Sequence, residues 1–382
     1  MRAAAALMAA FLGLILTAPA WAANFETKAK YAILVDSRSG KTYFDKKADE
    51  LMSPASMSKI MTLVVVFEML RKHVLSLDDE IEISENAWRK GGAASGSSTM
   101  FAKPGTREKL GTLIRAVVIA SANDAAIAIA ESIAGSEEAF AALMTKRARE
   151  LGLKKSTFAN ATGLPDPKQK MTARELAQLT RYLIEVFPDY YKLFSEKVFE
   201  WGGHKQYNRD PLLGRYPGAD GVKTGHTKES GYGMVASAVR DGRRLIAVLN
   251  GMKSKKERRE ETRKLLDWGF RQFQPVILYG PGETVGRARV WGGMADSVPL
   301  MAKDTIRARL SKDERAAADA EIVYSGPLRA PVRRGAEVAK LRIRLDGKTI
   351  AYFPLYAAKS VPATDSMWAK AFSTLKFWIF GG

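Results

Sequence analysis

The sequence predicts an α/β domain, in which helices surround and interrupt an antiparallel sheet, followed by a small all-β domain. Up to about residue 274, helical stretches alternate with short apolar runs typical of strands. From Pro275 onward, short strand-like runs are separated by Gly, Pro and Asp. The chain has 382 residues, of which 46% are hydrophobic and 26% charged, as expected for a globular protein of two domains.

The first 22 residues are predicted to be a secretory signal peptide. Arg2 supplies the positive charge, Ala3 to Leu16 is almost wholly apolar, and Ala20-Trp21-Ala22 gives the small-x-small pattern for cleavage before Ala23. The alternative is a permanent N-terminal membrane anchor. It is less well supported, because the apolar run is short for a membrane span and residues 24–30 are polar. We therefore expect an exported protein.

Composition excludes several kinds of chemistry. The chain has no cysteine and only three histidines, so disulfides, thiol nucleophiles and multi-histidine metal sites are not expected, and no cofactor is implied. The net charge is +19, or +18 once Arg2 is removed with the signal (19 − 1). The positive residues are scattered, which favours an anionic membrane surface or cell-wall polymer over nucleic acid as partner. The alternative is a basic protein that is merely soluble.

Within the predicted domain 23–274, a hairpin is expected over 31–35 and 41–44, and Asp241-Gly242 predicts a second hairpin between 231–239 and 244–249. The stretch from Ser56 to Leu70 has few polar residues on any side, which predicts a helix buried at the centre of the domain. Further helices are expected over 110–134, 137–151, 172–187 and 255–270.

The segment 275–361 is predicted to be a small β-sandwich, with strands over 283–291, 305–310, 320–324, 338–345 and 349–353. The terminal segment 362–382 contains a predicted amphipathic helix over 364–380. Trp368, Phe372, Leu375 and Ile379 recur at helical spacing with lysines nearby, which is typical of a helix lying on a membrane surface. The alternative is a helix that docks on the protein's own core.

Three short motifs carry candidate chemistry. In Ser56-Met57-Ser58-Lys59 the lysine lies one helical turn from the serine, and a buried lysine with a depressed pKa can remove the proton from a serine nucleophile. Ser121-Ala122-Asn123 offers a hydroxyl to relay protons and an amide for a substrate carbonyl. Lys223-Thr224-Gly225, continued by His226-Thr227, offers a cation and hydroxyls for a substrate carboxylate, with a glycine that permits close approach of a substrate backbone.

Each motif alone is a weak signal, because Ser373-Thr374-Leu375-Lys376 and Ser84-Glu85-Asn86 match the first two patterns. The ordered set, with its flanking residues, resembles the serine D,D-peptidases, the low-molecular-mass penicillin-binding proteins of the D-alanyl-D-alanine carboxypeptidase (peptidase S11) type. Segments 158–164, 171–176 and 264–270, the β-rich domain and the amphipathic tail are also similar to that family. One departure is Asp210, where the family usually has asparagine.

The resemblance implies a serine D,D-peptidase/β-lactamase-like fold and a role for each motif residue. Ser56 is the expected nucleophile, Lys59 its proton acceptor and Ser121 the proton relay, with the backbone N–H groups of Ser56 and His226 as the oxyanion hole. The expected substrate-binding residues are Asn123, Lys223, Thr224, Gly225, His226, Thr227 and Arg258, although Arg259 adjoins the last.

The resemblance also implies the substrate and the location. The expected partners are peptidoglycan stem peptides ending in D-Ala-D-Ala and, as covalent inhibitors, β-lactams. The expected location is the periplasm, with peripheral attachment to the inner membrane. Two rival functions are a class A β-lactamase, for which we find no Glu-x-x-Leu-Asn pattern, and a non-catalytic cell-wall binding protein. The oligomeric state is left open.

Overall fold

The computed structural model describes residues 25–272, 275–310, 312–345 and 347–368, together with residues 371 and 374. The chain divides into two compact units, one from Phe25 to Arg271 and one from Gln272 onward. The predicted signal peptide and most of the predicted helix over 364–380 lie outside the described residues. No helix of the described part is both long and apolar enough to cross a membrane.

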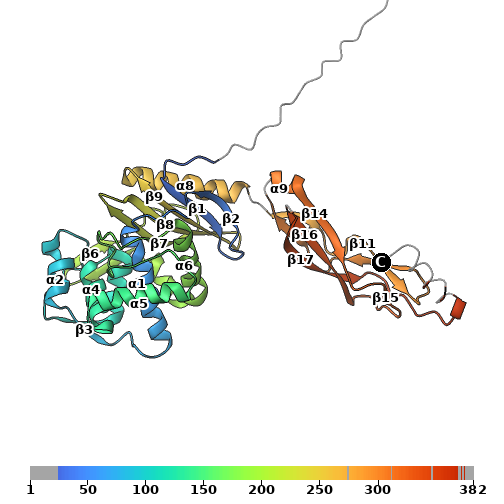
Figure 1. Cartoon of the computed structure of the whole chain (residues 1–382), viewed down its shortest axis with the longest axis horizontal. Coiled ribbons are helices and arrows are strands. Elements are labelled where there is room, and N and C mark those ends of the chain that lie inside the picture. Colours follow the sequence, from blue (N-terminus) through green and yellow to red (C-terminus); the bar gives the residue numbers. More distant parts are fainter. Residues whose placement is uncertain are drawn as a thin grey trace, which may run out of the picture. The chain divides into compact units, whose positions relative to one another are not determined.

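The first unit is built on a five-stranded antiparallel sheet with the order β2-β1-β9-β8-β7 (Figure 1). The strands are β1 (Tyr31–Asp36), β2 (Thr42–Lys46), β7 (Ala219–Thr227), β8 (Gly231–Arg240) and β9 (Arg243–Met252). Arg240 pairs with Arg243 across Asp241-Gly242, so the predicted hairpin turn is confirmed. The strand β7, which carries the third motif, is an edge strand.

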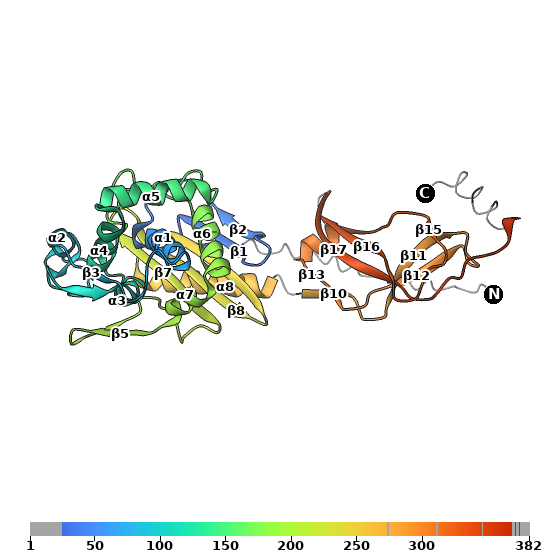
Figure 2. The same cartoon turned by 90° about the horizontal axis from the view of Figure 1, so that it is seen from below.

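The two faces of this sheet belong to different hydrophobic cores. Ile33 and Val35 of β1 pack into the core formed with helices α1 to α6, whereas Ala32 and Leu34 pack into a core shared with α8 (Lys255–Gln272). Figures 1 and 2 show α8 on one side of the sheet and α1, α5 and α6 on the other. Because successive side chains of β1 point to opposite faces of the sheet, this one strand contributes to the cores on both sides. The predicted α/β architecture is confirmed.

The central helix is α1, which begins one residue after Ser58. It follows the short 3₁₀ helix η1 (Ala55–Ser58) and runs over Lys59–Arg71, with every residue from Lys59 to Glu68 buried. The other helices of this unit are α2 (Glu85–Gly91), η2 (Ala93–Ser95), α3 (Leu110–Arg115), η3 (Ala116–Ala120), α4 (Asn123–Ala134), α5 (Glu137–Glu150), α6 (Ala173–Val186), α7 (Pro188–Tyr191) and η4 (Lys192–Ser195).

The helix expected over 110–134 is not continuous. The α-helical turns of α3 widen into the π-helical segment η3, after which Ser121 takes the left-handed conformation with φ of 61° and α4 starts at Asn123. The prediction of one uninterrupted helix was wrong, because the residues on both sides of the break are apolar and the sequence gives no sign of an interruption. A left-handed non-glycine residue after a π-helical turn is a strained feature of the kind found at functional sites.

Two small antiparallel strand pairs were not predicted from the sequence. They consist of β3 (Glu80–Glu82) with β4 (Arg107–Lys109), and of β5 (Val198–Trp201) with β6 (His204–Tyr207). Both are too short to show a clear alternation of apolar and polar residues. The β5–β6 pair is followed directly by the loop that carries Arg209.

The second unit is rich in strands, as predicted. A six-stranded sheet has the order β14-β16-β17-β12-β11-β15, and β10 and β13 form a separate pair. Residues from both, including Ile306 of β13 and Leu300 of β12, enter one hydrophobic core. The elements are β10 (Pro275–Tyr279), β11 (Thr284–Trp291), β12 (Ser297–Met301), β13 (Ile306–Arg309), α9 (Lys312–Ala317), β14 (Ala318–Val323), β15 (Leu328–Arg329), β16 (Glu337–Leu345) and β17 (Lys348–Ala357).

Two glycines let distant segments pack against η1. Gly163 has φ of 77°, and a Cβ there would overlap the carbonyl oxygen of Ala55. A Cβ on Gly225 of β7 would lie 2.9 Å from the carbonyl oxygen of Pro54. The missing side chain of Gly225 thus makes room for the turn that carries Ser56, and the expected close approach of a substrate backbone stays a prediction.

We predict that Gly163→Ala destabilises the first unit more than Gly152→Ala. Both glycines are left-handed, but only Gly163 meets backbone atoms, whereas Gly152 faces open space. Both variants lose about 1 kcal/mol to the left-handed conformation, and Gly163→Ala should lose roughly a further 1–3 kcal/mol to overpacking. Urea unfolding followed by tryptophan fluorescence measures the difference, and equal losses would contradict this account of the packing.

Candidate active site

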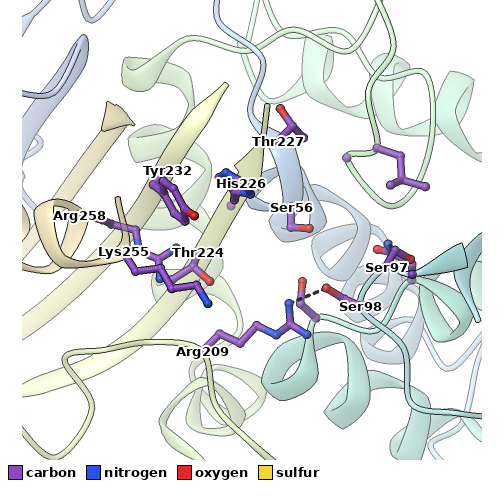
Figure 3. A pocket seen from close by; sticks show the side chains of 16 residues that line it. Ser56, Ser97, Ser98, Arg209, Thr224, His226, Thr227, Tyr232, Lys255 and Arg258 are labelled. Carbon is purple, nitrogen blue, oxygen red and sulfur yellow. Dashed lines mark hydrogen bonds between the residues drawn. The ribbon is translucent and has the colours of Figure 1, made fainter. Parts of the chain in front are cut away.

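The predicted site residues converge on one cavity of about 690 Å³ in the first unit (Figure 3). Except for Lys59 and Lys223, which are buried, all of them line this cavity: Ser56, Ser121, Asn123, Thr224, Gly225, His226, Thr227 and Arg258. They come from η1, the η3–α4 break, β7 and α8. The three motifs therefore meet in space although more than 160 residues separate the first from the last.

The amine of Lys59 is the centre of the hydrogen bonds at this site. It donates to the Ser56 hydroxyl at 3.0 Å, to Asn123 Oδ1 at 2.6 Å and to the carbonyl oxygen of Thr162 at 2.5 Å. The side chain is fully buried. Lys59 sits directly after η1, so the first turn of α1 places its amine beside Ser56.

Burial lowers the pKa of Lys59 to about 7, because the charged amine loses its hydration. The positive charge of Arg209 lowers this pKa further, whereas the carboxylates of Glu137 and Asp124 raise it. Burial is also the main cause of a strongly lowered pKa for Lys223, and the charge of Lys59 lowers it as well. Near neutral pH, Lys59 is therefore a mixture of amine and ammonium.

The Thr162 carbonyl that binds Lys59 is held by a local turn. The Oδ1 of Asn160 accepts hydrogen bonds from the backbone N–H groups of Thr162 (3.2 Å) and Gly163 (2.7 Å). Thr162 is buried, and its carbonyl also accepts a long contact of 3.5 Å from the Ser56 hydroxyl. A backbone acceptor has no residue-type signature, so the sequence motifs could not identify this partner.

The Ser121-Ala122-Asn123 motif lies at the break between η3 and α4. Ser121 has the left-handed conformation and lies on the cavity wall, near the start of α4. Both polar atoms of the Asn123 side chain form hydrogen bonds: Oδ1 accepts from Lys59, and Nδ2 donates to Ser97 Oγ at 3.0 Å. Asn123 therefore positions the amine, in addition to the expected contact with a substrate.

On β7, four consecutive residues from Thr224 to Thr227 line the cavity. The imidazole of His226 stacks on Tyr232, with ring centroids 3.9 Å apart. Partial burial and the nearby charges of Arg258 and Lys255 lower the pKa of His226, which favours the neutral ring. The hydroxyl of Thr227 pairs with Ser230 Oγ at 2.9 Å and so braces the β7–β8 turn.

Several cavity residues were not predicted from the sequence. Arg209, Lys255 and Tyr232 line the wall near Arg258, and Ser97 and Ser98 lie across from them (Figure 3). Arg209 Nη1 donates to Ser98 Oγ at 2.6 Å. Arg258 lines the cavity and Arg259 is not among the lining residues, which favours Arg258 in the choice that the sequence left open.

The cavity is strongly cationic. Arg209, Lys255 and Arg258 gather on one side of Ser56, and the residues that line the cavity include no carboxylate. Within the described residues, no cluster of histidines and carboxylates could hold a metal ion. The chemistry that this arrangement supports is activation of a serine hydroxyl by a buried amine, next to a binding region for an anion.

Comparison with known proteins identifies the family. A family model described as D-alanyl-D-alanine carboxypeptidase matches residues 17–254, and one described as the C-terminal domain of penicillin-binding protein 5 matches residues 273–363. The fold and site thus define a serine-type hydrolase. The chain belongs to the D-alanyl-D-alanine carboxypeptidase family.

Individual relatives cover most of both chains. D-alanyl-D-alanine carboxypeptidase DacC of Escherichia coli (strain K12) is 39% identical over 336 residues, which is 87% of this chain and 84% of the relative. The structure of penicillin-binding protein 5 from Haemophilus influenzae has a TM-score of 0.69 at 34% identity, covering 88% of this chain and 98% of that one. Penicillin-Binding Protein D2 from Listeria monocytogenes, solved in an ampicillin-bound form, matches with a TM-score of 0.58 at 29% identity, covering 65% and 99%.

The residue that departs from the family pattern, Asp210, is buried beside these cations. Its Oδ1 accepts from the backbone N–H of Leu212 at 2.7 Å, while Oδ2 is buried without a hydrogen-bond partner among the described residues. Burial raises the pKa of Asp210 from 3.8 to about 6, although the charge of Arg258 opposes this rise. The folded protein therefore holds a proton here that the unfolded chain releases between pH 4 and 6.

We predict that Asp210→Asn stabilises the protein at neutral pH. A raised carboxyl pKa in the folded state means that stability falls as pH rises from about 4 to 6, and the shift corresponds to roughly 3 kcal/mol at pH 7. The variant should remove most of this loss and flatten the dependence of unfolding free energy on pH. Asp241→Asn, at an exposed turn, is the control; identical pH profiles for wild type and Asp210→Asn would contradict the prediction.

Proposed function

We propose that this enzyme removes the terminal D-alanine from peptidoglycan stem peptides ending in D-Ala-D-Ala, through a covalent acyl-enzyme on Ser56. The observation that carries the proposal is the buried amine of Lys59, 3.0 Å from the Ser56 hydroxyl and with a pKa near 7. An amine with this pKa is present in both its neutral and its protonated form at pH 7, and the neutral form can accept the hydroxyl proton.

The proposed reaction has two steps. Ser56 Oγ attacks the carbonyl carbon of the penultimate D-alanine as Lys59 takes its proton, and the oxyanion is stabilised by the backbone N–H groups of Ser56 and His226. The C–N bond then breaks, and the departing amine of D-alanine receives the proton through Ser121. Water hydrolyses the ester in the second step and regenerates the Ser56 hydroxyl.

The cationic side of the cavity would bind the carboxylate of the substrate. Arg258 is buried and Arg209 is more exposed, and loss of hydration lowers the pKa of each guanidinium without neutralising it. Lys223 and the hydroxyl of Thr224 lie on the neighbouring strand. A terminal carboxylate placed against these groups would set the adjacent amide bond over Ser56, which explains specificity for a free C-terminus.

The same site should be acylated by β-lactams, whose strained amide and carboxylate resemble the end of the peptide. The ampicillin-bound form of the Listeria relative supports this part of the proposal. We further propose that the mature enzyme starts at Ala23, acts in the periplasm during peptidoglycan maturation, contributes to cell shape, and contacts the inner membrane through residues 362–382.

We predict that Ser56→Ala abolishes covalent labelling by a fluorescent penicillin and lowers D-alanine release by more than about a thousandfold. The variant removes the only hydroxyl that Lys59 contacts in the described structure. Labelling is read after denaturing gel electrophoresis, and D-alanine by a coupled oxidase assay. Ser373→Ala, in the other serine-x-x-lysine match, is the control and should retain both activities. Persistent labelling of Ser56→Ala would exclude Ser56 as the nucleophile.

We predict that the rate constant of penicillin acylation rises with pH through a midpoint near 7. The lowered pKa of Lys59 means that the reactive neutral amine is gained as pH increases and lost below the midpoint. Lys59→Arg should lower the rate by about a hundredfold or more, because a guanidinium stays protonated. Arg209→Gln should move the midpoint upward, since the charge of Arg209 lowers this pKa. A rate that does not vary from pH 5.5 to 9 would rule out this role for Lys59.

A further inference from the structure

A second cavity, of about 610 Å³, adjoins the catalytic cavity. It lies where the β7–β8 turn, the start of β1 and the end of β9 meet, and residues Leu51 to Ser53 close one side. His226, Thr227 and Tyr232 line both cavities. The two hollows therefore share the end of the strand β7 as a wall, and a chain leaving the catalytic cavity past Thr227 reaches the second one.

The lining of the second cavity is basic. It contains Lys30, Lys170, Lys228 and Lys253 against one carboxylate, Glu229. Within the described residues, Lys30, Lys228 and Lys253 have no ion-pair partner, whereas Lys170 binds Glu229 at 3.1 Å. The cavity thus already accommodates one carboxylate and has three cations left for others.

One wall of this cavity is fixed by a buried side chain. Asn250 is 1% exposed, and its Nδ2 donates to the carbonyl oxygen of Ser53 at 3.0 Å. This hydrogen bond ties the end of β9 to the segment that leads into η1 and Ser56. The second cavity is therefore built on the same rigid elements as the catalytic one.

The position of the cations sets the direction in which a substrate crosses the site. In Figure 3, Arg209 and Lys255 lie on one side of Ser56 and Thr227 on the other. If the terminal carboxylate binds to the arginines and the scissile carbonyl lies at Ser56, the acyl side of the peptide extends past Thr227. The residues that precede D-Ala-D-Ala then approach Lys170, Lys228 and Glu229.

We propose that the second cavity is a subsite for carboxylates in the part of the stem peptide that precedes D-Ala-D-Ala. This inference rests on the proposed function for the direction of the peptide, but it concerns a separate set of residues. In the free enzyme, Glu229 forms an ion pair with Lys170, and a carboxylate of an acidic peptide competes with Glu229 for this lysine. The subsite therefore selects acidic stem peptides over neutral ones of the same length.

The test compares two dansylated pentapeptides ending in D-Ala-D-Ala. One carries two side-chain carboxylates before the D-Ala-D-Ala end, and the other carries the corresponding amides. Fluorescence anisotropy measures their dissociation constants with full-length protein carrying Ser56→Ala, so that binding is read without turnover. Further substitutions in this background are Lys30→Gln with Lys253→Gln, Glu229→Gln, and the exposed control pair Lys103→Gln with Lys154→Gln.

We expect the Ser56→Ala protein to prefer the acidic peptide. The preference should fall by roughly three- to tenfold in the Lys30/Lys253 variant, since exposed charge pairs contribute modestly. It should rise with Glu229→Gln and stay unchanged in the control pair, which removes the same net charge elsewhere. Equal binding of the two peptides, or an equal fall in the control, would overturn the proposal.

A third outcome would assign the lysines to another anion. If the Lys30/Lys253 variant loses binding to phosphatidylglycerol vesicles while its peptide preference is intact, the cavity binds a lipid headgroup and the proposal is wrong. Failure of the proposed function is read separately, from penicillin labelling and D-alanine release by the wild-type enzyme. The binding assay decides on the subsite whatever that result is.

Discussion

The active site depends on the burial of one amine. Because Lys59 Nζ is removed from water, each of its protons needs an acceptor, and the acceptors come from η1, α4 and the turn at Thr162. Three segments that lie far apart in the sequence must therefore converge at one point. The same loss of hydration lowers the pKa of Lys59 to about 7. One physical constraint thus both assembles the site and brings the pKa of the amine close to neutral pH, as the proposed role of Lys59 as a base requires.

The segments that converge on the Lys59 amine approach one another so closely that two positions have no room for a side chain. Gly163 lies against Ala55, and Gly225 lies against Pro54 and Ala55, so the turn carrying Ser56 is held between a loop and the edge strand β7. The hydrogen bonds of the amine go to Ser56, Asn123 and Thr162 and not to either glycine. The role of the two glycines is to let the Thr162 carbonyl and β7 reach their places, which is why glycine at these points matters for geometry more than for flexibility.

The sequence was sufficient for the two hairpins of the sheet and for the buried helix, because alternation, turn residues and apolar composition are local patterns. The motif residues were singled out by their order along the chain and by the resemblance to the family. The sequence did not reveal the break at Ser121, since the residues on both sides are uniformly small or apolar. It gave no signal for the Thr162 carbonyl, which any residue type could provide, or for Arg209, which reaches the cavity only through the course of its loop. The chance match at Ser84-Glu85-Asn86 has a structural role instead: Ser84 caps α2, and Asn86 donates to Glu131 at 2.6 Å.

In the proposed function, recognition of an anion and activation of the serine use the same charges. Arg209 lines the binding side of the cavity, and its charge also lowers the pKa of Lys59. Asp124 and Glu137 act in the opposite sense on this pKa, and burial raises the pKa of each of these carboxyls. The residues that line the cavity include these cations and no carboxylate. Under the proposed function, the carboxylate of the peptide would supply the missing negative charge, so the interaction that positions the peptide would also relieve the repulsion among the cations that lower the pKa of Lys59.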